Sequence, residues 1–95
     1  MACYVLVQAE ITDVEKFKSY IAESPAIISK FGGKYLARAG TTVQFEGEKD
    51  NKRIVIIEFP SMEKAVKWYH SDEYRKVRKL RDGAAKGSLI AIEGC

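Results

Sequence analysis

Histidine, cysteine and proline are scarce in this sequence of 95 residues, which has one histidine, two cysteines and two prolines. A single histidine, His70, cannot form a multi-histidine metal site, and Cys3 and Cys95 do not have the spacing of metal ligands. We therefore expect no metal site. The low cysteine content favours a reducing, cytoplasmic setting with two free thiols, and a disulfide between Cys3 and Cys95 is the alternative.

Long apolar runs and a strong excess of one charge are missing too. No run approaches the roughly 20 residues of a membrane-spanning helix, so we expect no membrane partner. The first residues lack the basic segment and the cleavage site of a signal peptide. The net charge of +3 is mild, and it allows an acidic ligand without requiring nucleic acid. No glycine-rich phosphate loop, Cys-x-x-Cys pair or nucleophile elbow is present, and we expect no cofactor.

The composition, with 46% hydrophobic and 31% charged residues, is typical of a globular protein. A chain of 95 residues predicts one domain, 1–95, with one modest core. Four consecutive β-branched residues within Arg53–Phe59 predict a strand that is covered on both faces. Pro60 ends this strand, and Ser61 is the expected N-cap of a helix whose apolar face includes Trp68.

The first third of the chain predicts a strand followed by a helix. Residues Cys3–Ile11 alternate between an apolar face and a more polar one. Thr12 begins a capping-box pattern, which predicts that it caps a helix. Pro25 predicts a break in this helix near Ser24, and Gly32–Gly33 is expected to end it.

The remaining elements complete a recognisable order. Lys34–Ala39 predicts a second strand, and Thr42–Glu46 is expected to continue it beyond a bend at Gly40. Ser71 is the expected cap of a further helix, and Ser88–Glu93 predicts the last strand. The order β-α-β-β-α-β predicts an α+β fold, the ferredoxin-like sandwich, with a four-stranded antiparallel sheet and the helices on one face.

The two faces of this sheet are expected to carry different sets of side chains. Under the helices we expect Cys3, Val5, Val7, Val55, Ile57, Phe59, Ile90 and Ile92. On the open face we expect Leu6, Leu36, Ile54, Ile56, Leu89 and Ala91. Soluble monomers seldom expose an apolar patch of this extent. We therefore predict a homodimer in which two sheets face each other, with polar side chains at the rim of an enclosed pocket.

Three motifs carry a family resemblance: F-G-G-K-Y-L-A-R-A-G at 31–40, I-E-F-P-S-x-x-x-A-x-x-W-Y-x-S-x-E-Y at 57–74, and R-x-G-A at 81–84. With these motifs the chain resembles the family called domain of unknown function 1330. The resemblance implies the dimeric α+β barrel superfamily, which includes cofactor-free monooxygenases, muconolactone-type isomerases, haem peroxidases and ligand-binding regulator domains. The resemblance implies no particular activity, because the family itself has none established.

Arg38 and Glu58 are the first candidates for chemistry. Their strands are expected to be neighbours, and their positions in the alternation place both side chains on the open face. Arg38 could bind a carboxylate or an enolate, and Glu58 could act as a general base. The alternative is a structural ion pair that closes the mouth of the barrel.

Four further residues are candidates for the same site. His70 could shuttle protons near neutral pH, or it could simply lie exposed at the end of its helix. Gln8 and Tyr4 lie on the expected open face of the first strand and could bind a ligand, and Tyr4 could instead lie at the dimer seam. Trp68 could form an aromatic wall, although its helical spacing is also typical of a core residue.

A basic stretch at 75–81 raises the question of nucleic acid. The third strand lacks the stacking aromatics of RNA-recognition domains, so we expect no nucleic-acid partner. The sequence favours a homodimer that binds a small organic acid or aromatic compound, with cofactor-independent monooxygenation or isomerisation as the candidate chemistry. The alternative is a non-catalytic ligand-binding or structural dimer.

Overall fold

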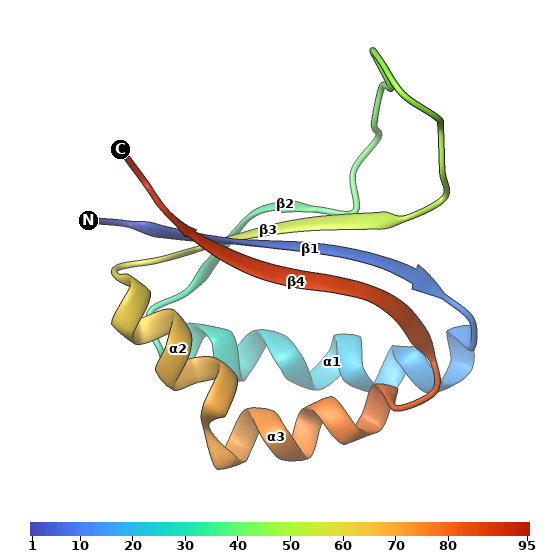
Figure 1. Ribbon diagram of the computed structural model, residues 1–95. Helices are drawn as coiled ribbons and strands as arrows, with labels where there is room; N and C mark the ends of the chain where they lie inside the picture. The colour runs from blue at the N-terminus through green and yellow to red at the C-terminus, as the bar shows by residue number, and fades with distance from the viewer.

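One antiparallel sheet with every helix on the same face makes up the computed structural model, which describes residues 1–95 (Figure 1). The strands, in the spatial order β2-β3-β1-β4, are β1 (Cys3–Ile11), β2 (Lys34–Arg38), β3 (Arg53–Phe59) and β4 (Ala85–Glu93). The helices are α1 (Val14–Lys30), α2 (Met62–His70), α3 (Asp72–Arg78) and the short 3₁₀ helix η1 (Lys79–Arg81). The predicted α+β, ferredoxin-like fold is confirmed.

Polar side chains cap the helices. Asp13 caps α1, because its backbone is extended and its carboxylate accepts a hydrogen bond from the amide of Lys16 at 3.1 Å. The prediction that Thr12 is the cap is therefore wrong by one residue, and the Thr12 hydroxyl bonds to a carbonyl in the turn before β4 instead. Ser61 and Ser71 cap α2 and α3 as predicted. None of these helices has the combination of length and hydropathy that crossing a membrane requires.

Helix α1 runs without interruption through Pro25, so the predicted break near Ser24 is wrong. A proline in a helix removes one hydrogen bond, and burial of Phe17 and Ile28 on either side keeps the helix in place. The carbonyl oxygen of Ile21 loses its usual partner, because the amide four residues later belongs to Pro25. This free carbonyl faces the candidate site described below.

The core lies between the sheet and the helices. The predicted register of β1 and β3 is confirmed, since Val5 pairs with Ile57 and both are buried. The buried residues of these two strands are Cys3, Val5, Val55, Ile57 and Phe59. Trp68 and Tyr74, from α2 and α3, are the largest side chains packed against them.

Strand β4 presents the opposite face from the one predicted. Leu89 and Ala91 pack against the core, whereas Ile90 and Ile92 are 60% and 63% exposed on the open face. The residues from 89 to 92 are all apolar, so they have no alternation that reveals which face is buried. Pairing with β1 decides the matter, since Leu89 lies opposite the inward-facing Val7.

Strand β2 ends at Arg38, and the predicted extension Thr42–Glu46 is not a strand. Ala39 has a left-handed backbone with φ of 53°, which turns the chain out of the sheet. Residues 39–52 then form a loop that rises from the sheet on the side away from the helices (Figure 1). Val43 and Phe45 in this loop are 71% and 91% exposed.

Candidate binding site

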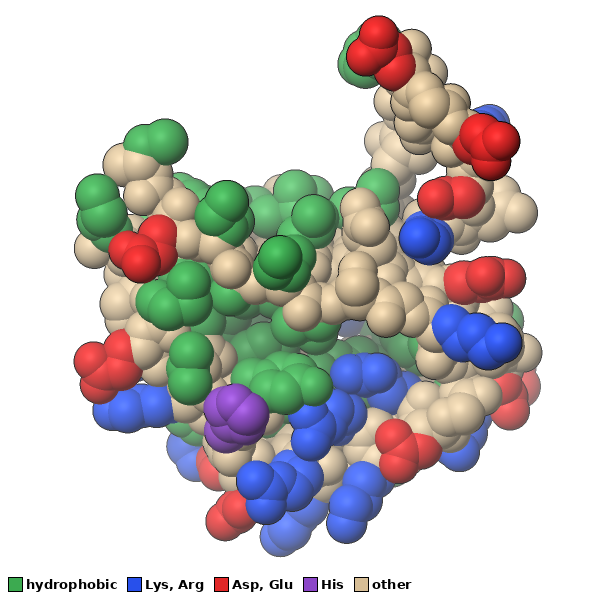
Figure 2. Space-filling model, in the orientation of Figure 1, with side chains coloured by type: hydrophobic (Ala, Val, Ile, Leu, Met, Phe, Trp, Pro, Cys, Tyr) green, Lys and Arg blue, Asp and Glu red, His purple; other side chains and the backbone are tan.

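A cavity of about 270 Å³ lies between the sheet and the helices. Figure 2 shows this hollow, with Lys and Arg side chains gathered on its helix side. Its aromatic walls come from α1, β2 and α2, namely Phe17, Tyr20, Tyr35, Trp68 and Tyr69. The cavity is thus on the opposite side of the sheet from the pocket that the sequence places between two subunits.

Four cationic residues border this cavity and no acidic residue does, although the pairing of Lys86 with Glu10 puts the Lys86 side chain in the alternation of the open face. They are Arg38, Arg53, Arg81 and Lys86. None of the three arginines belongs to a salt bridge. Burial lowers the pKa of Arg53, and the nearby charge of Arg38 lowers it further. The cavity therefore holds positive charge that no protein carboxylate neutralises.

Arg38 is held at the cavity by two contacts. Its Nη2 donates a hydrogen bond to the carbonyl oxygen of Ile21 at 3.3 Å, the carbonyl that Pro25 leaves free. Its guanidinium carbon lies 4.6 Å from the ring centre of Tyr35, a cation–π contact. The proline inside α1 therefore supplies the acceptor that orients the arginine.

A tyrosine pair forms another wall of the site. The hydroxyl oxygens of Tyr20 and Tyr74 lie 2.6 Å apart, and the guanidinium of Arg81 lies 5.1 Å from the ring centre of Tyr20. Burial raises the pKa of Tyr74, and its proximity to Tyr20 raises it further. Tyr74 therefore stays neutral at physiological pH, and its buried hydroxyl holds that of Tyr20 beside the cavity.

Arg38 and Glu58 do not meet, and the prediction that they share the open face is wrong. The pairing of β2 with β3 shifts between Tyr35 and Ala37, so that Arg38 pairs with Val55, which is buried under the helices. This bulge adds a residue to β2 and reverses the side-chain alternation beyond it. Glu58 remains on the open face, where the Nζ of Lys34 lies 3.2 Å from its carboxylate.

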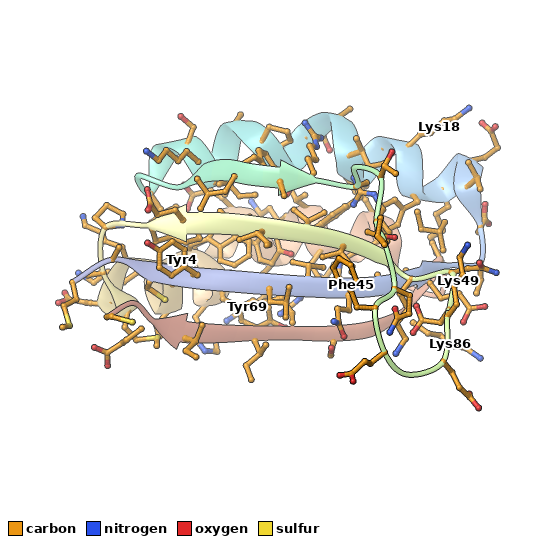
Figure 3. All side chains as sticks on the ribbon, turned by 90° about the horizontal axis from the view of Figure 1, so that it is seen from above. Tyr4, Lys18, Phe45, Lys49, Tyr69 and Lys86 are labelled. Carbon is orange, nitrogen blue, oxygen red and sulfur yellow. The ribbon has the colours of Figure 1, made fainter.

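Tyr4 accompanies Glu58 on the open face, as the view onto that face shows (Figure 3). A hydrogen bond to Glu58, together with the negative charge of that carboxylate, raises the pKa of Tyr4. These two candidates therefore form a cluster with Lys34, separated from the cavity by the sheet.

The remaining candidates have different positions. Trp68 is 1% exposed and lines the cavity. Gln8 pairs with Ile54, which puts its side chain on the open face as predicted, although the residue also borders the cavity. His70 is exposed at the end of α2, where its ring lies edge-on to Tyr69 at 5.3 Å, and it does not line this cavity. The structure thus brings Arg38 and Trp68 together around one cavity, and it leaves the Gln8 side chain on the open face.

Sequence reasoning missed Arg53, Arg81 and the two tyrosines of α1 and β2. For Arg53 a signal was present, because it shares the alternation of Val55 and Ile57, which face the helices. A charged residue on a covered face indicates a polar site there. Arg81 carried no such signal within its basic stretch. The structure contains no group of three His, Cys, Asp or Glu side chains that could hold a metal ion.

The fold and the cavity together define a ferredoxin-like α+β protein with room for a small molecule. The sequence matches the family described as "Domain of unknown function (DUF1330)" over residues 2–95, and the chain belongs to this family. No curated protein matches the sequence.

Solved structures share the fold at low sequence identity. A protein of unknown function from Rhodopseudomonas palustris has a TM-score of 0.80 at 19% identity, over 99% of this chain and 82% of its own. SnoaB, a cofactor-independent oxygenase from Streptomyces nogalater, has a TM-score of 0.71 at 12% identity, over 99% and 93%. A dimeric ferredoxin-like protein of unknown function from Bacteroides fragilis has a TM-score of 0.67 at 12% identity, over 98% and 96%. These similarities are similarities of fold.

Proposed function

We propose that the protein binds a small, planar organic anion in the cavity between its sheet and its helices, as a subunit of a homodimer. The observation that carries this proposal is the set of arginines without acidic partners around an aromatic-walled cavity. Arg53 and Arg81 are half-buried and Arg38 is exposed at the cavity, so a ligand anion would supply a partner for partly desolvated cations.

The charges of the cavity favour an anion over a neutral ligand. Arg53 is half-buried, and the charge of Arg38 already depresses its pKa. A carboxylate or phenolate near both guanidinium groups would relieve their repulsion and accept charge-assisted hydrogen bonds. Aromatic rings form the rest of the wall, and they offer faces and edges on which a planar ligand can pack.

Cofactor-independent monooxygenation or isomerisation is the finer proposal. Both reactions begin when a C–H bond beside a carbonyl or phenol loses its proton and leaves an enolate. Isomerisation returns a proton to another carbon. Monooxygenation of a CH₂ group consumes O₂, converts the carbon to a carbonyl and releases the second oxygen atom with the two hydrogens as water. The arginines would stabilise the enolate, and the shared fold with SnoaB supports this candidate.

Binding without catalysis is the second candidate, and one observation favours it. No carboxylate or imidazole lines the cavity, because Glu58 lies on the open face and His70 lies outside. General-base catalysis requires a base within hydrogen-bond reach of the proton that it removes. The titratable side-chain oxygens that remain around the cavity are tyrosine hydroxyls, among them that of Tyr20, which lies beside Arg81 and Tyr74.

A small phenol tests the binding proposal directly. The anion of 4-nitrophenol absorbs visible light, so its absorbance reports its own protonation state. We expect the protein to lower the apparent pKa of bound 4-nitrophenol, because the arginines stabilise the anion. Arg53→Met should weaken binding by roughly 10- to 100-fold, the loss of a hydrogen bond to a charged group of about 1.5–3 kcal/mol. Lys34→Met, on the open face, is the matched control and should change nothing.

Binding that is equally weakened by Lys34→Met, or absent altogether, would contradict an anion site in this cavity. Deuterium exchange then separates the two functions. If an aromatic 1,3-diketone exchanges its activated C–H with D₂O faster in the presence of the protein, and Arg53→Met slows this exchange, the protein catalyses enolate formation. Binding without accelerated exchange leaves a non-catalytic binding protein.

The homodimer is proposed from the open face of the sheet. Its side chains include Leu36, Ile90 and Ile92, which are 51%, 60% and 63% exposed. The loop that carries Phe45 rises on the same side, and Figure 3 shows Phe45 over the end of the sheet opposite to Tyr4. A second copy of the sheet would cover this apolar surface, and the Bacteroides fragilis protein of the same fold is described as dimeric.

A further inference from the structure

Ser24 is the only buried serine, threonine, amide or charged residue of the chain, with 2% of its surface exposed, and it lines the large cavity from α1. Tyr35, on β2, lines the same cavity and pairs with the inward-facing Ile57. Burial raises the pKa of Tyr35, while the charge of Arg38 and a hydrogen bond from Ser24 oppose this rise. Tyr35 therefore keeps its proton at neutral pH, with the Ser24 hydroxyl beside its own.

The groups around the Tyr35 hydroxyl are mostly donors. The guanidinium carbon of Arg38 lies 4.6 Å from the ring centre of Tyr35, and the charges of Arg38 and Arg53 both favour negative charge on the tyrosine oxygen. A guanidinium has no acceptor atom, and no acidic residue borders the cavity. Tyr20, the remaining titratable neighbour, already shares a hydrogen bond of 2.6 Å with Tyr74. We therefore expect the acceptor for the Tyr35 proton to come from the ligand.

We infer that Tyr35 donates a hydrogen bond to the anionic oxygen of the ligand, and that Ser24 is the positioning residue that directs the Tyr35 proton toward it. This inference rests on the proposed function. When Ser24 donates to the Tyr35 oxygen, the single proton of the tyrosine is free for another acceptor. Hydrogen bonds to an ionised oxygen are roughly twice as strong as neutral ones.

The arrangement favours phenolates and enolates as the ligand class, because their charge lies largely on one oxygen that several donors can share. The Tyr35 hydroxyl and the guanidinium groups of Arg38 and Arg53 are these donors. A carboxylate has a second oxygen that the arginines can bind without the tyrosine. In enolate chemistry the same donors would stabilise the oxygen on which negative charge develops.

The opposite direction of the bond between Ser24 and Tyr35 is the competing explanation. A serine within a helix can donate to the carbonyl four residues earlier, here that of Tyr20. Tyr35 would then donate to Ser24, and the pair would only fasten β2 to α1 without a donor left for a ligand. In that case Ser24→Ala would free the Tyr35 proton, and ligand binding would stay the same or become tighter.

The first measurement is the absorbance titration of 4-nitrophenol with native protein and with Tyr35→Phe, which keeps the ring and removes the hydroxyl alone. Tyr35→Phe should weaken binding of 4-nitrophenolate by roughly 10- to 100-fold, the loss of a hydrogen bond to a charged group. The apparent pKa of the bound ligand should move back towards its value in water. Tyr4→Phe, the same change on the open face, is the matched control and should alter neither quantity. Binding of 4-nitrobenzoate should fall less, and equal losses for the two anions would overturn the ligand class.

Ser24→Ala gives the second measurement, and alanine suits the interior of a helix, so this variant should fold. It should weaken binding of 4-nitrophenolate a few-fold in the native background and have no effect in Tyr35→Phe, where no phenol proton remains to be directed. If Tyr35→Phe binds as the native protein does, or if Ser24→Ala binds equally or more tightly, the inference is wrong while the anion site, which Arg53→Met tests, stands. If the native protein does not bind 4-nitrophenol, the proposed function itself fails.

Discussion

The two faces of the sheet are built from alternate residues of the same strands, yet the charged residues are unpaired on one face and paired on the other. On the covered face, Arg38 and Arg53 lie close together without an acidic partner. On the open face, Glu58 is paired with Lys34 at 3.2 Å, and the remaining surface is largely apolar. A surface prepared for a protein partner neutralises its charges, whereas a ligand site keeps a charge for the ligand. This difference is the basis of our proposal that the covered face binds a small molecule and that the open face binds a second copy.

Ile57 and Ile56 offer the strongest test of this comparison, because they are neighbours in β3 with the same side chain on opposite faces. Ile57 is 2% exposed, and Ile57→Ala should lower the free energy of unfolding by about 2–5 kcal/mol. Ile56→Ala should cost less in the isolated subunit. Its cost should grow with protein concentration, since the side chain is buried further only in a dimer. Urea unfolding at two protein concentrations measures both, and equal losses at low concentration would contradict the distinction.

Ile90 tests the open face alone. Because Ile90 is 60% exposed in the single chain, Ile90→Asp should leave the subunit folded. In a dimer the aspartate would be buried without a partner, at several kcal/mol, so the dimer dissociation constant should rise by on the order of a hundredfold. Val66→Asp, at a 49% exposed position on α2, is the control and should keep the native association state. Light scattering distinguishes the two, and a native protein that is already monomeric would end the dimer proposal.

The sequence predicted the covered face better than the site upon it. Alternation in β1 identified Val5 as a core residue, because its neighbours along the strand become polar towards the C-terminal end. The four apolar residues of β3 do not alternate, and the prediction that Val55 and Ile57 lie under the helices followed from the apolar set of β1. Register information was missing in the uniformly apolar end of β4 and in β2. There a one-residue bulge, which has no sequence signature in Tyr35–Ala37, moved Arg38 to the other face.

The unpaired arginines also explain why the sequence directed attention to the open face and not to this cavity. Arg38 was expected to have an acidic partner, and Glu58 was the acid that the strand pattern placed nearest to it. Arg53, in the same alternation as Val55, carried the better evidence, because it placed a second cation under the helices. Which groups close the cavity depends on the path of α1 over the sheet, and local sequence does not contain that information.

The pKa values of Tyr74 and Tyr4 allow the two faces to be compared through the pH dependence of stability. Both have a raised pKa, Tyr74 through burial and Tyr4 through its hydrogen bond to Glu58. Unfolded tyrosine loses its proton near pH 10, whereas folded Tyr74 keeps it to a higher pH. Below pH 10 both states are protonated. Above it the unfolded state binds fewer protons, so stability falls by up to about 1.4 kcal/mol per pH unit.

Tyr74→Phe should therefore flatten the loss of stability above pH 10. At neutral pH it should cost about 0.5–1.5 kcal/mol, because it removes the hydrogen bond to Tyr20. Tyr4→Phe should leave the alkaline slope nearly unchanged, since solvent screens the exposed pair that Tyr4 forms. Chemical denaturation between pH 7 and pH 11 measures these slopes, and an unchanged slope in Tyr74→Phe would show that its hydroxyl is not buried as the structure has it.

Pro25 gives the smallest expected effect on binding and the most specific one. In Pro25→Ala the new amide can bond to the carbonyl of Ile21 within α1, so this carbonyl no longer needs Arg38. The helix should gain stability, because an interior proline costs up to about 3 kcal/mol, partly offset by the greater freedom of alanine in the unfolded chain. Affinity for 4-nitrophenolate should fall only a few-fold, since Arg38 loses its orientation but keeps its charge. Stability and affinity should thus move in opposite directions.

A double-mutant cycle with Arg38→Met decides whether the proline acts through the arginine. If it does, Pro25→Ala should have no effect on affinity in the Arg38→Met background, because no guanidinium is left to be oriented. The gain in helix stability should persist there, since it depends on α1 alone. If Pro25→Ala weakens binding equally with and without Arg38, the proline acts on the shape of the cavity. In that case the hydrogen bond between Arg38 and Ile21 is a consequence of the fold without influence on the ligand.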